Sequence, residues 1–407
     1  MSQISPGDTA FVLMCAALVM IMTPGLAFFY GGLVRRKNVI TIMTQSFISL
    51  GVVSLIWVVV GFSLVFGTDV GGVIGGLDYV FLRGVGQLPN PEYGATIPFL
   101  AFFVFQVTVA VLTPALITGA FADRVPFKSW LLFLTLWSLF VYVPLAHWVW
   151  GGGFLQQWGV LDFGGGIVVH GSAGFTALAS LLVVKKRVFA SGEADRPSNV
   201  PLIALGLALL WFGWLGDNPG NALKADGVAA QAFVNTFLGG GLAMLMWLAI
   251  DWARTGKASI VGALTGGLAG LVGVTACAGF VPTWAACLVA LIAGAVCYYA
   301  VQLRGALKWD DSLDVWGVHG VAGPLGTLLV GVFAFASVDG VDGLLAGNAR
   351  QLGLQAAGVA IALTYVFVVA LVIYKVVDLV SGMNVSAEVE SGGLDEALHG
   401  EAAYDLA

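Results

Sequence analysis

The chain has 407 residues, of which 59% are hydrophobic and only 10% are charged. Soluble proteins carry roughly 25% charged residues, so this chain has too little polar surface to form a water-soluble globule. Its mean hydropathy is +0.95 and its formal net charge is −6, and no nucleic-acid partner is expected.

Uncharged stretches of about 20 residues, long enough to cross a bilayer as helices, recur along the chain. Open sheets cannot cross lipid, and a β-barrel would need alternating ten-residue segments, which the sequence lacks. The sequence therefore predicts an all-α polytopic membrane domain over 1–380, followed by a cytoplasmic tail over 381–407. The expected spans are 10–34, 38–66, 97–122, 129–150, 163–184, 200–216, 227–250, 258–279, 282–303, 315–338 and 351–374.

Lysine and arginine set the orientation of these eleven helices, because cytoplasmic loops carry an excess of both. The loops after the first, third, fifth, seventh and ninth spans hold thirteen of the seventeen basic residues. The N-terminus is therefore predicted to lie outside and the C-terminus in the cytoplasm. The thirteen are Arg35, Arg36, Lys37, Arg124, Lys128, Lys185, Lys186, Arg187, Arg196, Arg254, Lys257, Arg304 and Lys308.

Two short sequence patterns occur in both halves of the chain. Pro24-Gly25 in the first span has a counterpart in Pro219-Gly220, near the end of the sixth. The fifth and tenth spans contain the pentapeptides 170–174 and 319–323, which both read His-Gly-x-Ala-Gly. Because five spans per half is an odd number, a duplicated second half must be inverted relative to the first. The sequence thus predicts two inverted five-helix repeats plus an eleventh helix, with a substrate path where the repeats meet.

The two histidines, His170 and His319, lie deep in uncharged spans. Ionisable groups at membrane depth usually mark a path for ions, protons or substrate. An interhelical hydrogen bond would explain one such histidine, but two at matching repeat positions favour a functional pair. A metal site would need a carboxylate or a third histidine at i+3 or i+4, which neither has. The four cysteines form no CxxC pair, so neither a metal nor another cofactor is expected.

Segments around these histidines resemble the signatures of the Amt/Rh ammonium transporter family. The resemblance runs in order from the first span to the tail. The segments are Ala146–Gly153, Leu161–His170 and Asp314–Gly320, with 28–35 (FFYGGLVR) and 232–236 (AFVNT) in agreement.

This resemblance implies a homotrimer in the plasma (inner) membrane, in which each subunit has its own narrow pore. Ammonium would be recruited at the outer mouth, lose its proton, and cross an apolar lumen past His170 and His319. The resemblance also implies that Asp162 shapes the recruitment site and that Trp150 and Phe105 form its aromatic wall. A helix cap is an equal interpretation of Asp162. An isolated cation costs several kcal/mol at the bilayer centre, and neutral ammonia avoids that cost.

The outer gate of the family is a pair of stacked phenylalanines, and both positions differ here. The first falls on Val109 and the second on Asp217, while the serine that usually contacts ammonium falls on Asn221. These changes predict a wider and more cation-attracting mouth, which admits a larger amine or organic cation. The alternatives are that Asp217 binds Lys224 or caps a broken helix.

Other functions are possible on the same fold or composition. A sensor would need a separate partner, because too few residues follow the last span to form a signalling domain. An enzyme is not expected, because the sequence lacks HExxH, a Ser/His/Asp pattern and paired acids at helical spacing. The tail segment 393–404 resembles the region that packs under the pores in this family and, in some members, takes part in regulation by PII proteins. A solvated acidic tail is the alternative.

Overall fold

The computed structural model describes residues 4–189 and 197–404. Within these ranges, nine helices are long and apolar enough to cross a membrane, and two shorter apolar helices are Gly166–Ser180 and Ile260–Thr275. Each of the eleven expected segments overlaps one of these helices. The chain is therefore an all-α, multi-pass membrane protein, while the number of spans and their orientation remain predictions. Arg196, one of the basic residues behind the predicted orientation, lies outside the described residues.

The helices do not coincide with the spans one for one, because several spans contain a short 3₁₀ or π-helical turn. In chain order they are α1 (Pro6–Leu33), α2 (Val39–Ile56), η1 (Trp57–Gly61), α3 (Phe62–Phe66), η2 (Val80–Leu82), α4 (Phe99–Ile117), η3 (Thr118–Phe121), α5 (Phe127–Trp137), η4 (Ser138–Tyr142), α6 (Val143–Trp150), α7 (Phe154–Trp158), η5 (Gly166–Gly171), α8 (Ser172–Ser180), α9 (Val200–Gly220), α10 (Gly227–Thr255), α11 (Ile260–Thr275), α12 (Thr283–Ala306), η6 (Trp316–Gly320), α13 (Val321–Phe333), α14 (Ala336–Asp339), η7 (Leu344–Ala346), α15 (Ala349–Ser381), α16 (Ala387–Gly392) and α17 (Leu394–His399).

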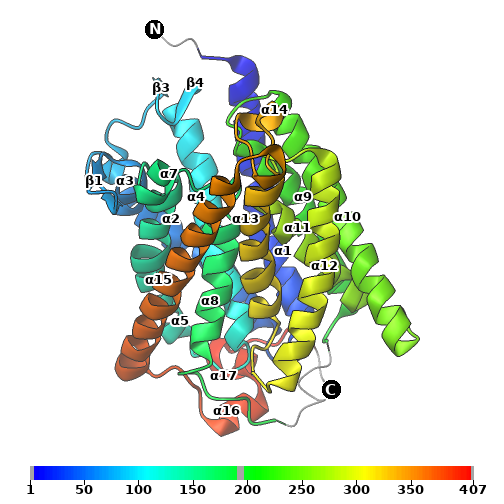
Figure 1. Cartoon of the computed structure of the whole chain (residues 1–407). Helices are drawn as coiled ribbons and strands as arrows, with labels where there is room; N and C mark the ends of the chain where they lie inside the picture. The colour runs from blue at the N-terminus through cyan, green and yellow to red at the C-terminus, as the bar shows by residue number, and fades with distance from the viewer. Residues whose placement is uncertain (1–3, 190–196, 405–407) are drawn as a thin grey trace.

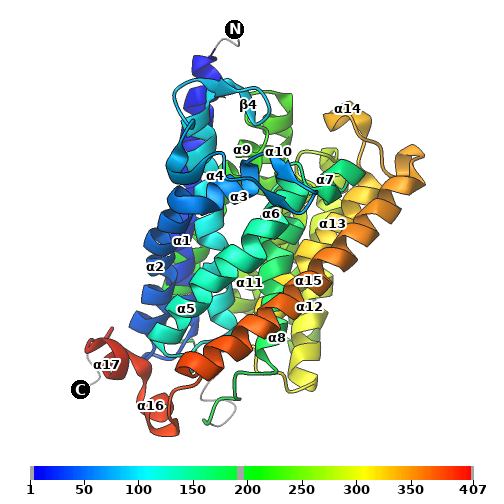
Figure 2. The ribbon, with the colours of Figure 1, turned by 90° about the vertical axis from the view of Figure 1, so that its left-hand side faces the viewer.

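The connecting elements gather at the two ends of the helical domain (Figures 1 and 2). Two antiparallel hairpins, β1 (Asp69–Val70) with β2 (Ile74–Gly75) and β3 (Pro89–Asn90) with β4 (Gly94–Pro98), lie at the end that holds the N-terminus. Helices α16 and α17 lie at the opposite end. We name these the outer and the inner end, following the predicted orientation.

Helices α1 and α9 pack closely, and glycine makes their approach possible. A Cβ atom on Gly206 would overlap the backbone nitrogen of Phe29, and one on Gly32 would lie 2.7 Å from the carbonyl oxygen of Asn199. Small residues at such crossings let helix backbones come together in lipid. The two Pro-Gly pairs of the predicted repeat lie in these same two helices.

A buried arginine joins three loops at the inner end. Arg124 is paired with Asp310 at 2.7 Å and donates to the carbonyl oxygens of Lys185 at 3.0 Å and Ala120 at 2.8 Å. Arg187 also pairs with Asp310, at 2.8 Å. Burial acts to raise the pKa of Asp310, but the two guanidinium groups outweigh it and lower that pKa below its ordinary value.

The tail packs against this inner end. Helix α15 ends at Ser381, where the tail was predicted to begin. The carboxylate of Asp395 accepts the N–H groups of Ile40 at 3.0 Å and Thr41 at 2.8 Å, and so caps the start of α2. The described part of the tail is therefore docked on the helical domain rather than free in solvent.

Candidate functional site

The imidazole rings of His170 and His319 meet, although 149 residues separate them in the chain. Their Nδ1 atoms lie 3.1 Å apart, so one ring can donate and the other accept a hydrogen bond. The ring centroids are 5.2 Å apart, and the two residues are 2% and 1% exposed. Because this hydrogen bond uses both Nδ1 atoms, each Nε2 remains the atom with which the ring can contact a ligand.

Each histidine lies in a π-helical turn, His170 in η5 and His319 in η6. Such turns insert an extra residue into a helix and are frequent at functional sites. Glycines of the repeated pentapeptide let the two segments cross. A Cβ atom on Gly174 would overlap the Cα of Gly320, and one on Gly323 would lie 2.8 Å from the Cβ of His170. The His-Gly-x-Ala-Gly pattern therefore supplies both the rings and the space that brings them together.

A buried aspartate caps each of these π-helical turns. The carboxylate of Asp162 accepts the N–H groups of residues 165–168 at 2.6–3.2 Å. The carboxylate of Asp311 accepts those of Val315 at 3.1 Å and Trp316 at 2.7 Å. Burial raises the pKa of Asp311, against the opposing effect of these hydrogen bonds. Asp162 is therefore a helix cap, which was one of its two interpretations.

A cavity of about 330 Å³ lies on the outer side of the histidines. Trp150, Asp162 and Asn221 are among its lining residues, together with Gln106. The indole Nε1 of Trp150 donates to the carbonyl oxygen of Asp162 at 2.8 Å, which holds the ring against the cap. Phe105 is fully buried beside Gly220, one layer behind this cavity. Of the four residues expected in recruitment, three thus lie on the cavity wall.

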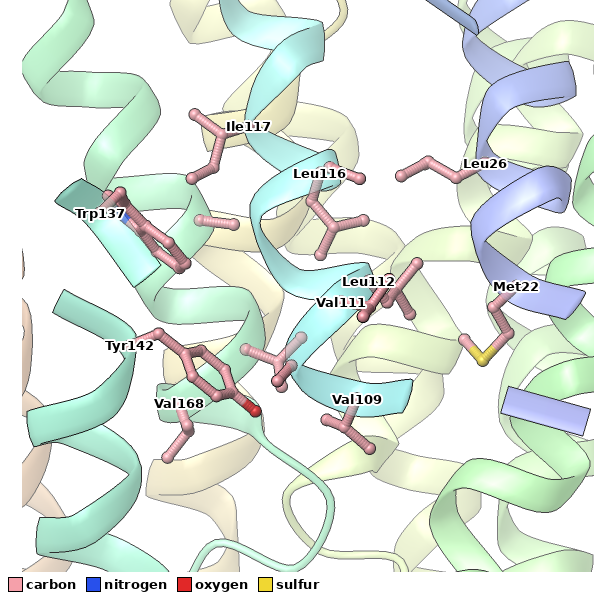
Figure 3. Close-up of a cluster of buried hydrophobic side chains, with 14 of the residues drawn as sticks. Met22, Leu26, Val109, Val111, Leu112, Leu116, Ile117, Trp137, Tyr142 and Val168 are labelled. Carbon is pink, nitrogen blue, oxygen red and sulfur yellow. The ribbon is translucent and has the colours of Figure 1, made fainter. Parts of the chain in front are cut away.

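The two altered gate positions are buried residues of α4 and α9. Val109 follows Gln106 by one turn of α4, and Figure 3 shows it among apolar side chains that include Leu112 and Met22. Asp217 lies in α9 and is only 5% exposed. Among the described residues, its Oδ1 has no hydrogen-bond partner.

Neither alternative interpretation of Asp217 is seen in the part of the chain that the structure describes. Lys224 is exposed, and no ion pair there joins it to Asp217. Helix α9 continues to Gly220, and among the described residues no backbone N–H is bonded to the Oδ1 of Asp217. The buried carboxylate of Asp217 thus forms neither the ion pair nor the helix cap in the described structure.

Trp214 is a site residue that sequence reasoning did not single out. Its ring stacks on His170 with centroids 5.3 Å apart. Its Nε1 donates to the hydroxyl of Thr275 at 2.9 Å, which fixes the indole. The chain has 13 tryptophans, and no spacing distinguishes this one, so the contact emerges only from the fold.

A second cavity, of about 190 Å³, lies on the inner side of the pair. His319 and Tyr30 are part of its wall, and so are Arg304 and Asp314, which form an ion pair at 2.6 Å. His319 therefore borders the inner cavity, and Trp214 packs against the ring of His170. A buried, ionisable pair with cavities toward both ends of the helical domain suits the passage of a small molecule.

Comparison with known proteins gives the family. Residues 10–404 match the model of the Ammonium Transporter Family. The chain belongs to this family. An ammonium transporter of Bacillus subtilis is 45% identical over 401 residues, which cover 98% of each chain. Ammonium transporter Amt1 of Archaeoglobus fulgidus is 43% identical over 400 residues, or 98% of this chain and 100% of that one. As a member of a transport family, the chain is not an enzyme.

Solved structures of the Ammonium Transporter Family share the fold. Mep2 of Saccharomyces cerevisiae superposes with a TM-score of 0.88 at 33% identity, covering 95% of this chain and 91% of that one. A structure described as a sensor Amt protein also gives a TM-score of 0.88, at 30% identity, covering 97% and 98%. These likenesses confirm the predicted all-α membrane fold and the resemblance noted in the sequence.

Proposed function

We propose that this member of the family transports ammonium across the plasma membrane, along the path that His170 and His319 divide. The observation that carries the proposal is the buried imidazole pair with a cavity on either side. Its relatives are named ammonium transporters, which supports the substrate. Because a bare cation at membrane depth costs several kcal/mol, nitrogen passes the rings as neutral ammonia, which can exchange hydrogen bonds with them.

Recruitment takes place in the outer cavity. Trp150 presents an aromatic face there, and cation–π attraction is worth about 0.5–2 kcal/mol. Asp162 holds this wall in place through its carbonyl oxygen and adds negative charge behind it, and Asn221 and the buried Phe105 complete the site. The cation gives up its proton in the outer vestibule, which extends from this cavity to the histidines.

The altered gate widens the mouth of the path. Val109 and Asp217 stand where the family has two phenyl rings, so less bulk and more negative charge lie above the histidines. This supports the entry of a larger amine or organic cation. Uptake competition in a strain that lacks ammonium carriers tests the idea. If bulky amines neither enter nor compete while ammonium and methylammonium move normally, the wider gate is ruled out.

The assembly and its regulation are also part of the proposal. We expect a homotrimer with one path per subunit, and a cytoplasmic PII-type protein as regulator of the docked tail. Native mass spectrometry of the purified protein should give three times the mass of the chain, and a tail-dependent complex should form with added PII protein. A monomer, or PII binding that is unaffected by loss of the tail, would argue against these two points respectively.

The transport function itself is tested by labelled methylammonium uptake in the same carrier-deficient strain. Expression of the chain should restore uptake, and His170→Ala and His319→Ala should each reduce it about tenfold or more, at equal membrane abundance. The loss of a transition-state contact worth about 1.4 kcal/mol already gives a factor of ten. Uptake that is the same with and without the chain would refute the proposal.

A sensor role is the second candidate, favoured by the likeness to the sensor Amt protein. In this second candidate, the chain acts as an ammonium sensor together with a separate partner. Ammonium-dependent gene expression that persists in an uptake-dead His170→Ala strain, and disappears when the chain is deleted, would support sensing over transport.

A further inference from the structure

The carboxylate of Asp217 occupies a middle position along the proposed path. In α9, Trp214 precedes it by three residues and stacks on His170, while Asn221 follows it by four and lines the outer cavity. Residues three or four apart lie on the same face of a helix, about 5 Å apart along its axis. The Asn221 amide donates to the backbone carbonyl of Asp217 at 2.9 Å, which ties the two turns together. Asp217 therefore lies between the recruitment cavity and the histidines.

This carboxylate lacks a counter-charge in the described structure. It is 5% exposed, and its Oδ1 accepts no hydrogen bond there. No ion pair with Asp217 is found among the described residues. A buried carboxylate without a partner is strongly unfavourable unless something positive comes to it. The site is thus short of positive charge.

A second side-chain acceptor without a donor among the described residues lies next to Asp217 in α9. Asn218 uses its amide nitrogen to bond Thr236 at 2.9 Å, and its Oδ1 has no partner among the described residues. Pro219 has no N–H, so the carbonyl of Leu215, four residues earlier, loses its helical donor. Unsatisfied buried acceptors call for a ligand that donates hydrogen bonds.

We infer that Asp217 is a cation-binding residue inside the path, and that it holds a small N–H-bearing monovalent cation between the outer cavity and the histidines. Ammonium and methylammonium fit, because each combines one positive charge with several donors. The inference rests on the proposed function and deepens it, since it adds a second binding position beyond Trp150. Removal of the charge should weaken cation binding without removing the recruitment cavity.

Infrared difference spectra of membranes perfused with ammonium chloride test the inference directly. Wild type should show ammonium-induced changes in carboxylate bands, which disappear in Asp217→Asn and shift in Asp217→Glu. If a weak band change remains in Asp217→Asn, the ammonium concentration that gives half of the maximal change should be about tenfold higher than in wild type. A factor of ten corresponds to about 1.4 kcal/mol of binding free energy. Asp251→Asn is a matched control, because Asp251 lies in α10 within 3.5 Å of the Tyr298 hydroxyl and away from the path. Potassium chloride at the same concentration controls for ionic strength.

The outcomes separate this inference from the proposed function. Carboxylate changes that persist in Asp217→Asn with unaltered half-saturation would overturn the cation site and leave transport intact. The changes should survive in His170→Ala, in which transport is impaired, because binding precedes the histidines. A wild type that moves no ammonium, yet shows Asp217-dependent bands, would refute transport and keep the site. Size-exclusion profiles establish that each variant folds. If Asp217→Asn does not fold, the shifted carboxylate bands of Asp217→Glu still test the inference.

Discussion

Asp162 and Asp311 occupy equivalent positions in the two halves of the chain. Each lies eight residues before a histidine of the pair, and each caps the π-helical turn that carries this histidine. The pattern of the sequence repeat thus extends beyond the pentapeptides to the residues that position them. Both turns therefore begin at a buried carboxylate that accepts several of their N–H groups.

Replacing Asp162 by Asn should misplace His170. An amide keeps one acceptor but turns an NH₂ group toward the remaining backbone donors, and hydrogen bonds to charged groups are worth about 1.5–3 kcal/mol each. We expect a fall in melting temperature together with a loss of transport of about tenfold or more. Asp311→Asn should act in the same direction on His319. Normal stability and transport in both variants would show that the caps do not position the rings.

The crossing of the two pentapeptides should not tolerate a methyl group. In Gly174→Ala, the new Cβ would overlap the backbone of Gly320, which cannot move as a flexible side chain can. Overpacking of this kind costs about 3 kcal/mol or more. Thermal melting and uptake should both be impaired. Gly353→Ala is the matched control, because nothing lies within 4 Å of a Cβ there, and it should behave as wild type.

The contacts behind the predictions for Asp162 and Gly174 could not be predicted from hydropathy. The repeat in the sequence predicted that His170 and His319 form a pair. Nothing local encodes a π-helical turn or the stacking of Trp214, since both depend on the partner half. Helix α15 runs on to Ser381, beyond the predicted 374, because Lys375 is exposed and Gly382 with φ +74 stops the helix.

The inner cluster around Asp310 should make the protein sensitive to acid. Because the folded-state pKa of Asp310 is lowered, its contribution to stability is complete above the unfolded value of about 4 and is lost as pH falls below it. Asp310→Asn should lower the free energy of unfolding by about 3 kcal/mol at neutral pH, as expected for a broken buried ion pair. Its melting temperature should also fall less steeply than that of wild type as the pH is lowered. Melting temperature between pH 7 and pH 3 measures this. Glu401→Gln, in an exposed tail carboxylate, should retain the wild-type pH profile.

The docked tail should influence transport. Deletion from Val385 onward removes the Asp395 cap on α2 and the 2.6 Å bond from the N–H of Val188 to Glu390. We expect an altered rate of methylammonium uptake at equal membrane abundance. Deletion from Glu401 onward keeps both contacts and serves as the control. Unchanged uptake after the longer deletion would show that the tail does not influence transport.

The central claim is that His170 and His319 act as one unit that passes nitrogen without its charge. Ammonium flux into proteoliposomes should be measured for wild type, His170→Ala, His319→Ala and the double variant. Residues that act together give non-additive losses. We predict that each single variant loses nearly as much flux as the double variant. Additive losses, or wild-type flux in the double variant, would contradict the account.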